Sequence, residues 1–243
     1  MHLTTSTTGT GPRHVALVHG LGGNGATWAP LIERMTATGR YTVTTVDLRG
    51  HGSSDRAPSY ALDELADDLV ENLPHGLDSV VGHSLGGSVL VRAVGRLAPA
   101  RAIYLDPGFH LTLPTTGLRG RLFWAAPLVT LGFAQLRQSR QSAAAKALYK
   151  PAVRESIARA QREFDRGMAI GVFRDVAFHP LAPAAPEVPS TIVLSDDSPA
   201  VLPDTLAAEL EGLGWDIRRL PRVHHDMQLE NPDGTFQMIE DVL

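Results

Sequence analysis

The chain has 243 residues, a formal net charge of −4, 43% hydrophobic residues and 20% charged residues, as an ordinary soluble globular protein has. Its length permits a large core, and its weakly acidic balance favours no nucleic-acid partner. Because the chain has no cysteine, disulfides, thiolate metal sites and a cysteine nucleophile are excluded. The sequence has no stretch typical of a membrane span or a secretory signal, so we expect a cytoplasmic protein.

The first twelve residues, 1–12, are rich in Thr, Ser and Gly, which predicts a disordered lead-in. After them, short apolar runs alternate with amphipathic segments and Gly-rich turns. The predicted strands are 15–18, 41–46, 79–81, 102–105, 191–194 and 216–220, and the predicted helices are 28–38, 62–73, 85–97, 206–213 and 234–243. Strands that are apolar on both faces and alternate with helices predict an α/β fold, with a mostly parallel sheet flanked by helices.

The alternation stops after Gly108, where the chain carries helical signals and no convincing strand until about residue 178. Four prolines within residues 179–189 then return it to the sheet. We therefore divide the chain into a core, 13–108 and 188–243, and a helical cap or lid insertion, 109–187. The insertion is expected to lie over the strand ends and to supply much of a substrate pocket. Its apolar residues include Leu118, Leu122, Phe123, Trp124, Leu128, Val129, Leu131 and Phe133. The alternative is that these residues simply pack the cap onto the core.

A Gly-rich motif joins a predicted strand to a predicted helix at residues 82–87, Gly-His-Ser-Leu-Gly-Gly. A sharp strand-to-helix reversal would force Ser84 into strained geometry, and glycines two residues away on either side remove the Cβ atoms that would clash. The hydroxyl would then project at the carboxyl end of the strand, beside the free N–H groups of the helix N-terminus. The motif predicts Ser84 as a nucleophile; the alternative is a serine that caps the helix.

Four motifs in this order resemble those of the α/β-hydrolase family. The resemblance lies in residues 19–22 (oxyanion loop), 47–54 (a structural turn), 82–86 (nucleophile elbow) and 225–232 (the block with the catalytic histidine). It covers most of the chain and implies a serine hydrolase with a catalytic triad and a cap. It also implies that the backbone N–H groups of Leu21 and Leu85 form an oxyanion hole, which stabilises the negative charge of a tetrahedral intermediate.

The same resemblance indicates the general base. In the family a histidine precedes a Glu-x-Pro triplet by five residues, and the triplet at residues 230–232 places it at His225, with His224 as the second candidate. Imidazole suits this role because its pKa lies near neutrality. His83 is expected to point elsewhere, whereas His19 and His51, in Gly-rich turns, are expected to line the site or to hold loops together.

A carboxylate should fix the tautomer of His225, and two places can supply it. The family's usual acid follows the predicted strand 191–194, but there the alignment puts Ser198, so Asp197 or Asp196 would have to serve. Some members take the acid from the end of the preceding strand, where Asp106 stands. We expect Asp106, with Asp197 as the alternative acid.

The expected activity is that of a carboxylesterase acting on a small or medium apolar ester through an acyl-enzyme intermediate. No cofactor and no metal are expected, and the partner is a small-molecule substrate; both a monomer and a homodimer are compatible with the sequence. The same triad could instead serve thioester, lactone or C–C bond cleavage, or a cofactor-free lyase or perhydrolase reaction. A non-catalytic ligand-binding or signalling protein on this scaffold is the other alternative.

Overall fold

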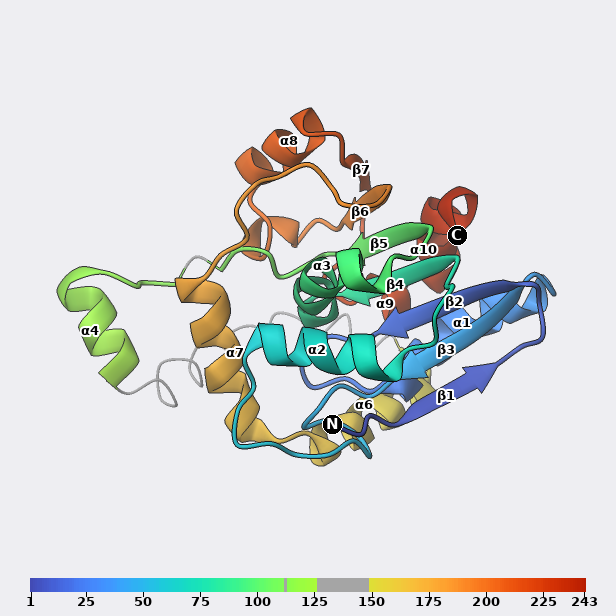
Figure 1. Ribbon diagram of the computed structural model, residues 1–243, viewed down its shortest axis with the longest axis horizontal. Helices are drawn as coiled ribbons and strands as arrows, with labels where there is room; N and C mark the ends of the chain where they lie inside the picture. The colour runs from blue at the N-terminus through green and yellow to red at the C-terminus, as the bar shows by residue number, and fades with distance from the viewer. Residues whose placement is uncertain (112, 126–148) are drawn as a thin grey trace.

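The computed structural model describes residues 1–111, 113–125 and 149–243, and in this part of the chain one sheet of seven strands runs through the molecule (Figure 1). The strands are β1 Thr5–Thr8, β2 Arg13–Val18, β3 Tyr41–Val46, β4 Ser79–His83, β5 Arg101–Leu105, β6 Ser190–Leu194 and β7 Asp216–Arg219. Their order is β1-β3-β2-β4-β5-β6-β7; β1 pairs antiparallel with β3, and the other pairs are parallel. The predicted α/β fold with a mostly parallel sheet is confirmed.

Helices cover both faces of this sheet. The helices in the described part of the chain are α1 Ala29–Ala37, α2 Leu62–Asn72, α3 Leu85–Leu97, α4 Gly117–Ala125, α6 Pro151–Glu163, α7 Arg166–Phe178, α8 Asp204–Gly212, α9 Met227–Glu230 and α10 Pro232–Ile239. One apolar cluster joins α2, α3 and α8 to one face, and a second joins α1 and α10 to the other. Strand β2 contributes Ala16 and Val18 to the first cluster and Val15 and Leu17 to the second. This alternation explains why the strand is apolar from Val15 to Val18.

The expected disordered lead-in differs from the structure, because residues 5–8 form strand β1. Thr5 pairs with Val46 and Thr8 with Val43, along the outer edge of β3. β-branched threonine favours a strand, and the edge of β3 offers free backbone groups for pairing. All four side chains of β1 are exposed, so the segment shows no apolar signal that would have predicted it.

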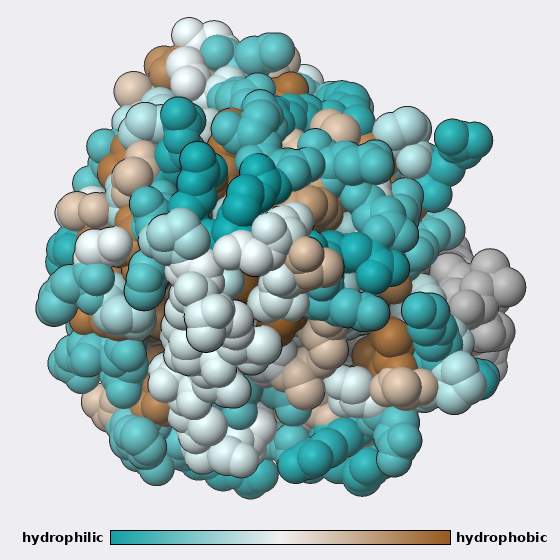
Figure 2. All heavy atoms as spheres, turned by 90° about the vertical axis from the view of Figure 1, so that its right-hand side faces the viewer, coloured by the Kyte–Doolittle hydropathy of each residue, from teal (hydrophilic) through white to brown (hydrophobic). Residues whose placement is uncertain are grey.

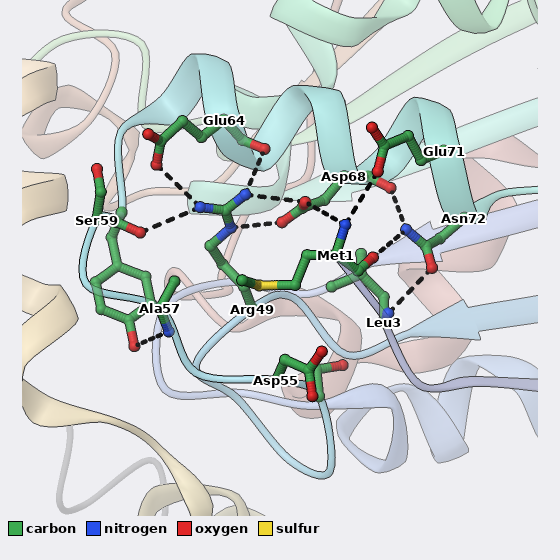
Figure 3. A network of polar contacts seen from close by, with 12 residues as sticks. Met1, Leu3, Arg49, Asp55, Ala57, Ser59, Glu64, Asp68, Glu71 and Asn72 are labelled. Carbon is green, nitrogen blue, oxygen red and sulfur yellow. Dashed lines mark hydrogen bonds and ion pairs between the residues drawn. The ribbon is translucent and has the colours of Figure 1, made fainter.

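The turn motif at residues 47–54 is anchored to α2 by a buried ion pair (Figure 3). The guanidinium of Arg49, 9% exposed, donates two hydrogen bonds to Asp68, and a third goes to Glu64 at 2.9 Å. These hydrogen bonds raise the pKa of Arg49, and those that it donates to Asp68 have the largest effect. The amino group of Met1 lies 3.0 Å from a carboxylate oxygen of Glu71 and 3.6 Å from one of Asp68, which ties the start of the chain to the same helix.

The described parts of the insertion lie between β5 and β6 in the chain. Helices α4 and α7 lie on the side to which the carboxyl ends of the parallel strands point (Figure 1). Helix α7 is held on the core by its buried Met168, Val172 and Val176, and by Asp175, which accepts the Leu62 N–H at the start of α2 at 2.8 Å. The division of the chain into a core and a cap at residues 109 and 187 stays a prediction.

The opposite end of the sheet, seen in Figure 2, presents mostly polar and intermediate side chains with small separate apolar areas. Among the helices that the structure describes, none is both long and apolar enough to cross a membrane.

Candidate active site

Ser84 lies on the sharp turn between β4 and α3. Its backbone has φ 50° and ψ −114°, a conformation that costs a non-glycine residue free energy. A Cβ atom at Gly82 would lie 2.7 Å from the carbonyl oxygen of Gly86, and one at Gly86 would lie 2.2 Å from that of Val18. Both positions therefore require glycine, and the turn has the strained geometry that its motif predicts.

The structure brings Ser84, His225 and Asp106 together from three separate segments. His225 Nε2 lies 2.9 Å from Ser84 Oγ, and His225 Nδ1 lies 3.3 Å from Asp106 Oδ2. Ser84 follows β4, Asp106 follows β5, and His225 precedes α9. The imidazole therefore bridges a hydroxyl and a carboxylate, as a general base with its orienting acid must.

Asp106 is fully buried, but its carboxylate accepts hydrogen bonds from several donors. Burial alone would raise its pKa, but hydrogen bonds from His225, Ser195 and Ser198 outweigh burial and lower the pKa below its ordinary value. The Ser195 N–H donates to Oδ1 at 2.8 Å, and the hydroxyls of Ser195 and Ser198 donate to the same carboxylate. The carboxylate is therefore ionised at neutral pH and can stabilise a positive charge on the imidazole.

The alternative acid, Asp197, lies elsewhere. Its side chain is exposed, and in the described part of the chain its carboxylate makes no hydrogen bond to His225. Ser198, which the alignment places at the family's usual acid position, instead donates to Asp106. Sequence reasoning did not find the roles of Ser195 and Ser198, although a serine at the acid position was itself a signal that the acid had moved.

His225 is mostly buried, which alone would lower its pKa, but the hydrogen bond and charge of Asp106 outweigh burial and raise it. His224 points away from Ser84: its ring is exposed, and Nδ1 lies 3.0 Å from a Glu230 carboxylate oxygen, whose hydrogen bond raises the pKa of His224. Of the two candidate bases, the structure therefore brings only His225 to Ser84.

His83 was expected to point away from the site, but the structure places it against His225. Its ring centroid is 4.9 Å from that of His225, and its Nε2–H donates to the backbone carbonyl of His225 at 2.9 Å. Burial, followed by the charge of His225, lowers the pKa of His83 to about 4. A neutral His83 thus holds the backbone of the candidate base, a contact for which the sequence offered no signal.

The predicted oxyanion donors lie beside the nucleophile. In the described part of the chain, neither the Leu21 N–H nor the Leu85 N–H donates to a protein acceptor. Leu85 is the first residue of α3, where backbone N–H groups lack intrahelical partners. A Cβ atom at Gly20 would lie 3.1 Å from the Ser84 Cβ, so the loop that carries Leu21 runs against the nucleophile.

The apolar residues expected to line a pocket are only partly placed. On α4, Leu118 is 72% exposed and Leu122 is 64% exposed. The Trp124 Nε1–H donates to the Pro114 carbonyl at 2.9 Å, and the Trp124 ring packs 5.5 Å from that of Phe178. The Phe123 ring packs 5.2 Å from that of Trp124. Four residues of that prediction, Leu128, Val129, Leu131 and Phe133, lie outside the described residues.

Comparison with solved structures shows the same fold in other proteins. A thermophilic esterase from Thermogutta terrifontis aligns with a TM-score of 0.72 at 23% identity, over 98% of this chain and 92% of its own. An enol-lactonase from Burkholderia xenovorans LB400 aligns with a TM-score of 0.71 at 21% identity, over 99% of this chain and 95% of its own. At such identities these likenesses show the fold alone.

Sequence relatives match shorter segments. A pimeloyl-[acyl-carrier protein] methyl ester esterase of Sodalis glossinidius is 34% identical over 137 residues, 54% of this chain and 49% of the relative. A 2-(acetamidomethylene)succinate hydrolase of Mesorhizobium japonicum is 38% identical over 92 residues, 36% of this chain and 32% of the relative. The matched segments thus span half or less of these relatives.

A family model described as the alpha/beta hydrolase family, however, matches residues 15–238, almost the whole chain. The protein belongs to the alpha/beta hydrolase family.

Proposed function

We propose that the protein is a serine carboxylesterase that hydrolyses esters of small or medium apolar acyl groups. The observation that carries this proposal is the distance of 2.9 Å between Ser84 Oγ and His225 Nε2, with the other ring nitrogen of His225 facing the buried carboxylate of Asp106. A hydroxyl in this arrangement can give up its proton as it attacks a carbonyl carbon.

The proposed mechanism has two acyl transfers. In the first, Ser84 Oγ attacks the ester carbonyl carbon while its proton passes to His225 Nε2, and the N–H groups of Leu21 and Leu85 donate to the developing oxyanion. The intermediate then expels the alcohol, which takes the proton from His225 and leaves an acyl-serine. In the second transfer, water attacks the acyl-serine by the same steps and releases the acid.

An ester is the favoured scissile bond because several sequence relatives, among them the one from Sodalis glossinidius, are methyl ester esterases. The preference for an apolar acyl group follows from the apolar residues of the insertion, which we propose to be a cap that supplies much of the pocket. Thioester, lactone or C–C bond cleavage, and a lyase or perhydrolase reaction, would use the same three side chains on another substrate.

The test combines covalent labelling with a substrate panel. A fluorophosphonate probe should add one adduct to the intact mass of the wild-type protein and none to the Ser84→Ala variant. p-Nitrophenyl esters from acetate to laurate should be hydrolysed faster than an acyl-thioester or a lactone. A wild-type protein that neither labels at Ser84 nor turns over any of these compounds would contradict the proposal in favour of a ligand-binding protein.

The pH dependence of activity should follow the protonation of His225. Only the neutral imidazole can accept the proton of Ser84, and the pKa of His225 is raised above its ordinary 6.5. We therefore expect kcat/KM to fall as the pH is lowered, with a midpoint above 6.5. His83 should not contribute to this fall, because its pKa is about 4. A pH profile of kcat/KM on the best ester measures the midpoint, and one well below 6.5 would contradict this assignment.

A further inference from the structure

The oxyanion loop, residues 19–22, is held by two buried histidines. The Nδ1–H of His19 donates to the carbonyl oxygen of Gly20 at 2.8 Å, while Nε2 accepts the Leu48 N–H at 3.0 Å. His51 Nε2 accepts the Gly22 N–H at 3.0 Å, and its Nδ1–H donates to the Arg49 carbonyl at 3.2 Å. Both rings must therefore be neutral, with the proton on Nδ1.

These two contacts fix the peptide groups on either side of Leu21. The carbonyl and N–H of a trans peptide point in opposite directions, so a bond to the Gly20 carbonyl sets the direction of the Leu21 N–H. The bond from the Gly22 N–H to His51 holds the next peptide in the same way. His19 thus orients the donor peptide itself, and His51 keeps the following peptide from rotating.

The ring of His51 is in turn held by the helical insertion. Phe164, which directly follows the last residue of α6, stacks on it with ring centroids 4.8 Å apart and planes 29° apart. The neighbouring Asp165 N–H donates to the Gly50 carbonyl at 2.8 Å. On the other side of Phe164, the carboxylate of Glu163 accepts a hydrogen bond from Asn24, just beyond the oxyanion loop, at 3.1 Å.

We propose that His51 is a positioning residue, and that Phe164 holds it against Gly22 so that docking of the insertion fixes the oxyanion-hole donor of Leu21. The proposal rests on the proposed function, because an oxyanion hole matters only to a protein that forms a tetrahedral intermediate at Ser84. The insertion then contributes to the chemical step as well as to the substrate pocket. If Phe164 left His51, the ring could turn and the Gly22 N–H would lose its acceptor.

The first test compares two replacements of His51. Methionine fills the space but offers no comparable acceptor, so His51→Met should lower kcat about 10- to 100-fold while KM changes less than about threefold. Glutamine places an oxygen near the position of Nε2, so His51→Gln should retain kcat within about fivefold of the wild type. A packing role alone would give the opposite order, since buried methionine is the better apolar replacement.

The second test addresses the link to the insertion. Phe164→Leu should lower kcat about 3- to 10-fold, and combined with His51→Met it should add little, because both changes release the same peptide. A trifluoromethyl ketone, which forms a hemiketal with Ser84, should lose affinity by the same factor as kcat/KM in each variant. His75→Met, at an exposed loop position, is the matched control and should leave both quantities unchanged.

The outcomes separate the two proposals. A wild type that turns over esters, together with an equally active His51→Met or a His51→Gln no better than His51→Met, would overturn the positioning role alone. A wild type that neither labels at Ser84 nor hydrolyses esters would overturn both. Thermal unfolding of each variant reports its folding; if His51→Met fails to fold, the inhibitor affinity of Phe164→Leu decides, and an unchanged value overturns the proposal.

Discussion

Replacing Asp106 with asparagine is expected to lower kcat by about 10⁴-fold while the protein remains folded. Asparagine keeps the volume of this fully buried side chain, so the core has no cavity to close. It removes the negative charge that stabilises protonated His225, and its amide can hold the imidazole in the wrong tautomer. The measurements are kcat on the best p-nitrophenyl ester and the midpoint of thermal unfolding.

The matched control is Asp197→Asn, at the alternative acid. This exposed side chain has no hydrogen bond to His225 in the described part of the chain, so kcat should stay within about twofold. In the Asp106→Asn variant, the fall of the residual kcat/KM with decreasing pH should have its midpoint at a lower pH than in the wild type. The reason is that the contact with Asp106, which raises the pKa of His225, is lost. A fully active Asp106→Asn variant and an inactive Asp197→Asn variant would show that the acid is Asp197, in the loop after β6.

The fold could be predicted because its signals are local. A strand covered by helices on both faces must be apolar at successive positions, and β2, β4 and β5 all show such runs. Strand β1 was not predicted, because its stability comes from backbone pairing with β3 and not from burial of its threonines. An edge strand of this kind carries little information in its own residues.

The candidate nucleophile could be predicted for the same reason: the whole turn around Ser84 is encoded in adjacent residues, including Gly82 and Gly86, where any added Cβ atom would clash. The sequence favours Asp106 as the acid but leaves Asp197 open, because Asp106 and His225 are 119 positions apart in the chain. Pairing of Leu105 with Val193 brings the end of β5 beside the loop after β6, where Ser195 donates to Asp106. That register depends on the folded sheet.

The histidines around the site are distinguished by their hydrogen-bond partners. His19 and His51 each accept a backbone N–H, a bond that only a neutral ring can make, and burial lowers the pKa of both. His225 instead faces the carboxylate of Asp106, which raises its pKa and favours the protonated ring. These environments support the proposed roles, in which His19 and His51 hold loops and His225 transfers the proton.

Replacing His225 with glutamine is therefore expected to have the larger effect on turnover, about 10⁶-fold in kcat. Glutamine can occupy the space and hydrogen-bond to Ser84, but it cannot accept a proton at any pH used for the assay. Ester hydrolysis and the rate of fluorophosphonate labelling should fall together, because both require an activated Ser84. Neither should recover at higher pH, which distinguishes a lost base from a base with a shifted pKa.

The neighbouring residue supplies the control, since His224→Gln changes the same kind of side chain one position earlier. His224 is exposed and bonded to Glu230, so its loss should change kcat less than about threefold. The opposite ranking would mean that the loop before α9 rearranges when substrate binds and that His224 replaces His225 at Ser84. Equal and large losses in both variants, with unfolding midpoints unchanged, would instead make the two histidines a coupled pair and contradict a single-base mechanism.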